Sequence, residues 1–155
     1  MDWIVFLRWL HVLGACVLLG TGAGIAFFML MAHLTRDART VAAVARIVVI
    51  ADYLFTATAV VVQPITGGLL MKEVGYRLED RWIVVSLGLY VWTGLWWLPV
   101  VWMQSRMAKL ARAAADIGEP LPAAYHRLFR AWFAFGFPAF AAVVAILWLM
   151  IAKPF

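Results

Sequence analysis

Four long apolar stretches dominate this chain of 155 residues, and they constrain its fold more than any other feature. They cover about residues 3–31, 47–71, 82–103 and 133–151, and each has at least the roughly 20 residues that a helix needs to cross a bilayer. A backbone in hydrocarbon must satisfy its own hydrogen bonds, which an isolated strand cannot do. We therefore predict a single all-α membrane domain, residues 1–155, built as a bundle of four transmembrane helices.

Charged and turn-forming residues separate the stretches, at about residues 33–46, 72–81 and 104–132. In the last connection Arg106, Lys109 and Arg112 recur at helical spacing. This spacing predicts that the third helix continues past the bilayer into the cytoplasm. Residues 118–122, which read Gly-Glu-Pro-Leu-Pro, are expected to end it.

The distribution of Lys and Arg predicts the topology. The first and third connections carry eight of these residues and the opposite side carries five. Because basic loops tend to stay in the cytoplasm, we expect both chain termini on the outer side. The net charge of +5 is spread over short loops, so membrane lipids are the expected partners of these cations and nucleic acid is not.

Polar side chains inside membrane spans are costly, and they mark candidate functional sites. His11, Gln63 and Tyr90 each lie eight residues from the outer end of their span, at a depth of roughly 12 Å for a rise of 1.5 Å per residue. Arg8 and Lys153 lie nearer the outer surface. Together they predict a pocket that opens outward, with cations at its mouth and an imidazole deeper in.

This set of residues suits a b-type haem or a porphyrin as cofactor. His11 is the predicted metal ligand, Arg8 and Lys153 would pair with the propionates, and Gln63 and Tyr90 would line the pocket. The alternative interpretation is structural: His11 would hydrogen-bond a neighbouring helix, and the two cations would reach the lipid headgroups. The sequence leaves open whether the protein is an enzyme.

Asp52 is a further costly side chain inside a span, and we expect it to pair with Arg46 or Arg106 in the packing of the helices. A proton-relay role is the alternative for this residue. His33 and His126 are both expected on the cytoplasmic side, where two imidazoles without further ligands do not define a metal site. Nucleotide-binding, zinc-peptidase and hydrolase motifs are absent from the sequence.

Five segments carry a resemblance that covers nearly the whole chain: FLRWLHVLGA, GTGAGIAFFM, VVQPITG, WLPVVWMQ and FPAFAAVVAILWLMIAKPF. They resemble a bacterial family of small integral membrane proteins classed as a domain of unknown function. That family is similar to HemJ-type protoporphyrinogen oxidases and to CopD-like membrane proteins. Arg8 and His11 match the start of the first conserved HemJ-type span, and Lys153 matches the Lys-Pro that closes the last helix of HemJ-type proteins. Val84 and Ser86 stand where HemJ-type proteins have His and Lys.

The resemblance implies a bacterial inner-membrane protein that binds haem b or a porphyrin, with a second copy or a redox partner in the membrane. The residues and the resemblance together leave three classes of function open. The first is electron transfer or porphyrin oxidation. The second is a non-catalytic packing or assembly subunit, and the third is a small metal or solute permease with Asp52 and Gln63 along its path.

Overall fold

The computed structural model describes residues 2–154, and its regular elements within that range are all helices. They are α1 (Trp3–Leu34), α2 (Ala38–Ala51), the π-helical turn η1 (Asp52–Thr56), α3 (Ala57–Val74), α4 (Arg81–Ile117) and α5 (Ala123–Ala152). Because α2, η1 and α3 follow one another without a break, they form one rod. The result is four helices that are long and apolar enough to cross a membrane. The predicted all-α bundle of four membrane helices is confirmed.

The helices extend beyond the apolar stretches, so the connections are shorter than expected. The first connection covers residues 35–37 instead of the predicted 33–46, and the third covers residues 118–122 instead of the predicted 104–132. Asp37 caps α2 by accepting a hydrogen bond from the Thr40 N–H, and Gly118, with φ of 71°, ends α4. The predicted continuation of the third helix is confirmed, since α4 runs to Ile117. Hydropathy marks the part of a helix that suits lipid, whereas caps mark where the helix ends.

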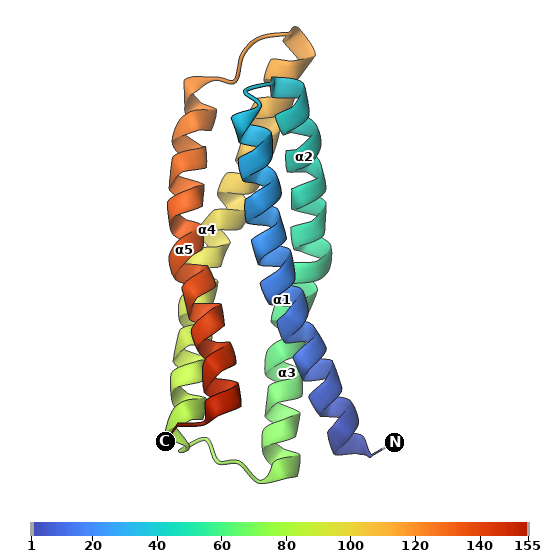
Figure 1. The fold of residues 1–155 in the computed structure, drawn as a ribbon, viewed down its shortest axis with the longest axis vertical. Coiled ribbons are helices and arrows are strands. Elements are labelled where there is room, and N and C mark those ends of the chain that lie inside the picture. The colour runs from blue at the N-terminus through green and yellow to red at the C-terminus, as the bar shows by residue number, and fades with distance from the viewer. Residues whose placement is uncertain (1, 155) are drawn as a thin grey trace.

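The main buried core lies at the end of the bundle opposite the chain termini, at the top of Figure 1. The end of α1, α2, the second part of α4 and the first part of α5 meet there, and we call this the core half. Its fully buried side chains include Met29, Val41, Met107 and Tyr125. The buried Trp132 indole donates to Gln104 Oε1 over 3.1 Å, so the polar groups in this core are paired.

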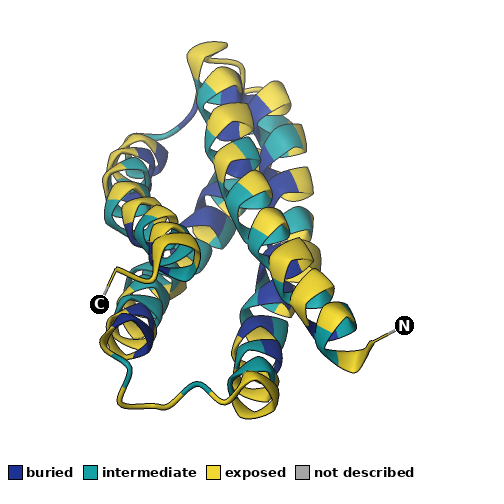
Figure 2. Ribbon diagram, turned by 60° about the horizontal axis from the view of Figure 1, so that its bottom comes forward, coloured by how far each residue is buried: buried dark blue, intermediate teal, exposed yellow. Residues whose placement is uncertain are grey.

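Toward the chain termini the bundle divides into two pairs of helices, α1 with α3 and α4 with α5 (Figures 1 and 2). We call this the terminal half. Large apolar side chains such as Trp9, Phe137 and Trp148 are exposed there, and exposed bands run along every rod in Figure 2. Such a surface is suited to contact with lipid acyl chains.

Candidate functional site

The candidate site lies in the terminal half, where α1 and α3 run antiparallel. His11 of α1 lies against Gly67 of α3, so that a Cβ added to the glycine would come within 3.2 Å of the ring's Cε1. Gln63 of α3 lies against Gly14 of α1, where an added Cβ would come within 3.3 Å of the side-chain amide. Each helix therefore places one polar side chain over a glycine of the other, and this lets the two helices approach closely.

Thr66 fixes the His11 ring by a hydrogen bond, with 2.8 Å between His11 Nδ1 and Thr66 Oγ1. The same hydroxyl lies 2.9 Å from the Val62 carbonyl oxygen in its own helix. A hydroxyl has one hydrogen, so when Thr66 donates to Val62 the imidazole donates from Nδ1 and Nε2 keeps its lone pair. In that tautomer Nε2 is the nitrogen available to a ligand.

The sequence interpretation did not predict that Thr66 and Gly67 contact His11, although a signal for these two residues exists. They follow Gln63 by three and four residues, and residues at these spacings share a helix face. The sequence therefore allowed the prediction that a partner of His11 lies at one of these two positions.

Gln63 is 8% exposed, and its Oε1 has no hydrogen-bond partner within residues 2–154. A buried amide oxygen without a donor is costly, and the surrounding hydrocarbon offers none. A water molecule or a ligand with a hydrogen-bond donor would satisfy this oxygen. At the contact between α1 and α3, the His11 imidazole and the unpaired Gln63 oxygen therefore lie on neighbouring turns.

Tyr90 reaches across from α4 and donates its hydroxyl to the Val60 carbonyl oxygen of α3. In a regular helix that carbonyl would accept from residue 64, but Pro64 has no N–H to donate. Tyr90 therefore satisfies the acceptor that Pro64 leaves free, and it ties α4 to α3 next to Gln63. The structure thus brings His11, Gln63 and Tyr90 to neighbouring positions along α3.

The two cations predicted at the pocket mouth lie in different surroundings. Arg8 is exposed, one turn from His11 on α1. The Lys153 ammonium donates to the Tyr76 hydroxyl and lies 4.5 Å from the centre of that ring and 5.3 Å from the centre of the Trp82 ring. These contacts hold the end of the chain on the α3–α4 connection. The chain termini lie on opposite sides of the terminal half (Figures 1 and 2).

Asp52 opens the π-helical turn η1 and is 4% exposed. The expected pairing with Arg46 or Arg106 is not formed: within residues 2–154 the ion pairs are Arg77–Glu79 and Arg112–Asp116. The Trp97 indole donates to Asp52 Oδ1 instead, over 3.4 Å. The sequence contains no signal for this partner, since only the packing of α4 on the second rod places the indole there.

His33 and His126 do meet in the core half, with ring centroids 5.6 Å apart. His33 stacks on Phe129 at 3.6 Å, and its Nδ1 lies 3.3 Å from the Tyr125 hydroxyl. Within the described range, no three His, Cys, Asp or Glu side chains gather in a way that could hold a metal ion. The aromatic contacts therefore give His33 a packing role between α1 and α5.

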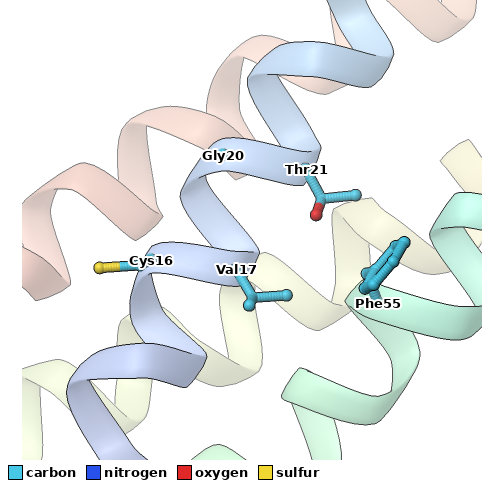
Figure 3. A pocket seen from close by; sticks show the side chains of 5 residues that line it. All are labelled: Cys16, Val17, Gly20, Thr21 and Phe55. Carbon is cyan, nitrogen blue, oxygen red and sulfur yellow. The ribbon is translucent and has the colours of Figure 1, made fainter. Parts of the chain in front are cut away.

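An open hollow lies between α1 and η1, lined by Cys16, Val17, Gly20, Thr21 and Phe55 (Figure 3). Cys16 is a free thiol and points away from Phe55. The lining is mostly apolar and the hollow is open to the outside of the bundle. It offers room for an acyl chain and lacks the polar groups that fix a cofactor.

The fold and the site define an integral membrane protein of four helices. Polar side chains from α1 and from α4, His11 and Tyr90, both bond to the rod of α2, η1 and α3. The chain belongs to the family described as predicted integral membrane protein (DUF2269), which it matches over residues 5–154. No curated protein and no solved structure gives a significant match.

Proposed function

We propose that this protein binds a b-type haem or a porphyrin in the terminal half, with His11 as the single axial ligand. The observation that carries the proposal is the contact of His11 Nδ1 with Thr66, which leaves Nε2 as the ligand nitrogen. A second shell that orients the imidazole is typical of histidines that bind metals. Gly67 beside the ring provides close access to the backbone.

We propose further roles for the residues around His11 in holding this cofactor. Arg8 lies one turn toward the chain terminus and is exposed, so its guanidinium is free to pair with a propionate. Gln63 supplies an unpaired acceptor for a polar group of the ligand or for a bound water. Lys153 is held by Tyr76 and Trp82, and we therefore leave it out of the site. When bound, such a cofactor supplies one-electron transfer, and the protein's own residues bind and orient it.

We propose that the bound cofactor serves electron transfer or porphyrin oxidation, the chemistry that the resemblance to HemJ-type oxidases implies. Electron transfer or porphyrin oxidation also requires an electron partner in the membrane, either a redox protein or a second copy of this chain. The side with eight Lys and Arg would face the cytoplasm of a bacterium, which puts the site and both termini on the outer side. Reporter fusions at each end would test this orientation.

The absorption spectrum of the detergent-purified protein, expressed with ample haem precursor, tests the proposal. A Soret band that shifts on dithionite reduction, at about one haem per chain, is expected from a single axial histidine. The band should be lost in His11→Ala and kept in His126→Ala, the matched control at an exposed position near the start of α5. A featureless spectrum from folded, monodisperse wild-type protein would exclude the haem proposal.

A second candidate is a non-catalytic packing or assembly subunit, and the paired contacts of His11 with Gly67 and Gln63 with Gly14 favour it. Polar side chains set over glycines fix the register of two helices without any ligand. This candidate predicts that His11→Ala lowers the thermal stability of a protein that never carries a chromophore. A wild-type stability in His11→Ala would exclude it.

A further inference from the structure

The second membrane rod carries a stripe of buried polar side chains. Asp52, Thr56, Gln63 and Thr66 are each exposed by 8% or less. Their spacings of four, seven and three residues keep them on one face of the rod. Ala59, 5% exposed, lies on the same face between Thr56 and Gln63. The stripe runs from the middle of the rod into the terminal half, because α3 leads to the α3–α4 connection (Figure 1).

The side-chain atoms on either side of Ala59 are unpaired. Thr56 Oγ1 and Gln63 Oε1 are buried, and within residues 2–154 neither has a hydrogen-bond partner at normal geometry, although the Thr56 hydroxyl lies near the Asp52 carboxyl group. They are seven residues apart, which is about 10 Å along a helix. The methyl group of Ala59 is small and makes no hydrogen bond. Buried waters typically occupy such positions, where they bridge polar groups that the protein leaves unsatisfied.

Asp52 lies at the end of this stripe farthest from the α3–α4 connection, and within residues 2–154 its only hydrogen bond to another rod comes from Trp97. In the described part of the chain no cation pairs with it. The nearest ionisable groups along the surrounding elements are exposed or bonded elsewhere: Cys16 and His33 on α1, Arg46 on α2, Lys72 on α3, and Tyr90 and Arg106 on α4. An unpaired carboxylate in hydrocarbon is strongly disfavoured, so a bound cation must neutralise it.

We propose that Asp52 is a proton-binding site and that water along the stripe from Thr56 to Gln63 connects it to the terminal half. The carboxylate takes up one proton and becomes a neutral acid, then returns the proton to the adjacent water. No other reactant is required. The π-helical turn carries this residue, and such turns are frequent at functional sites. The proposal does not depend on a haem at His11.

Dicyclohexylcarbodiimide tests the proton site on the full-length protein in detergent. This apolar reagent forms adducts with protonated carboxyl groups in apolar surroundings, and exposed carboxylates are ionised at neutral pH. We expect one adduct, on the peptide that contains Asp52, and its loss at alkaline pH. Asp116→Asn, which removes an exposed carboxylate, should keep the adduct and Asp52→Asn should lack it.

Two results would overturn the assignment. The first is an unlabelled Asp52 in folded wild-type protein at neutral pH. The second is labelling that sodium suppresses at constant pH, which would assign the carboxylate to a metal cation instead of a proton. Both are read from wild-type protein by peptide mass spectrometry, so neither depends on whether a variant folds.

Thiol accessibility tests the water path. In a Cys16→Ser background, Ala59→Cys places a thiol between the two unpaired oxygens, and Val61→Cys places one on the exposed face of the same helix. A charged methanethiosulfonate reagent should modify Ala59→Cys at least about tenfold faster, because only a hydrated thiol forms the reactive thiolate. Equal rates, or faster reaction at Val61→Cys, would exclude water along the stripe.

Discussion

His11 and Gly67 are in direct contact across the α1–α3 interface, with the imidazole Cε1 only 3.2 Å from where a Cβ of residue 67 would be. The His11 ring can adopt this orientation because residue 67 of the opposite helix has no side chain. Thr66, the neighbour of this glycine, holds the ring at Nδ1, the nitrogen bonded to that Cε1. Two adjacent positions of α3 therefore determine where His11 can point.

Gly67→Ala should destabilise the protein relative to Gly68→Ala. At Gly67 the new methyl group meets the His11 ring, whereas at Gly68 no group of residues 2–154 outside the adjoining helix backbone lies within 4 Å of it. Overpacking typically costs about 1–3 kcal/mol, so we expect Gly67→Ala to be less stable by about 1 kcal/mol or more. Thermal unfolding in detergent measures this difference. Equal melting temperatures for the two variants would show that the His11 ring is free to move aside.

Tyr90→Phe should cost about 1 kcal/mol, because the Val60 carbonyl then loses its donor. In a Pro64→Ala background residue 64 regains an N–H for that carbonyl, so Tyr90→Phe should cost much less there. A double-mutant cycle of denaturation in detergent measures this coupling. The interpretation fails when the cost of Tyr90→Phe is the same in both backgrounds.

Trp132→Phe should destabilise the core half by about 1–3 kcal/mol, because Gln104 Oε1 would be left buried without a donor. Adding Gln104→Leu should recover part of this loss, since the unpaired amide is then removed as well. Chemical denaturation of the single and double variants measures these differences in the free energy of unfolding. A double variant less stable than Trp132→Phe alone would show that Gln104 has another role in the core.

Lys153→Met should lower stability by about 0.5–1 kcal/mol through loss of its contacts with Tyr76 and Trp82. Lys72→Met, at an exposed position near the end of α3, is the matched control and should have no measurable effect. Haem content should be unchanged in both variants. A Soret band lost only in Lys153→Met would instead return this lysine to the propionate role expected from the sequence.

Asp37→Ala should destabilise the protein in a pH-dependent way. Hydrogen bonds from the Thr40 hydroxyl and backbone N–H hold the pKa of Asp37 below its usual range. The ionised form therefore stabilises the folded state at neutral pH, and this contribution is lost as the pH falls through the folded-state pKa. The difference in Tm between wild type and Asp37→Ala should shrink accordingly in acid.

Asp37→Asn is the control for this effect, because it keeps an N-cap acceptor without a titrating group. Its Tm should fall between those of wild type and Asp37→Ala at neutral pH. A difference between wild type and Asp37→Ala that stays constant into acid would mean that the charge of Asp37 plays no part.

The sequence by itself determined the class of fold and the depth of the polar residues. Apolar runs of membrane-spanning length leave helices as the main solution, and a fixed rise per residue puts His11, Gln63 and Tyr90 at one level. The Gly118 stop was also readable, because glycine at a helix end has a local cause. Each of these inferences depends on interactions within one segment of the chain.

Only the tertiary structure decided which side chains meet. Asp52 accepts a hydrogen bond from Trp97, whereas the sequence predicted an ion pair with an arginine. Lys153 donates to Tyr76, whereas the sequence predicted a place at the mouth of a pocket. Rotation of each helix about its own axis, and the divergence of the two helix pairs, select these contacts, and hydropathy carries no information on either. In a lipid-facing bundle nearly every face is apolar, so the usual signal for which face is buried is lost.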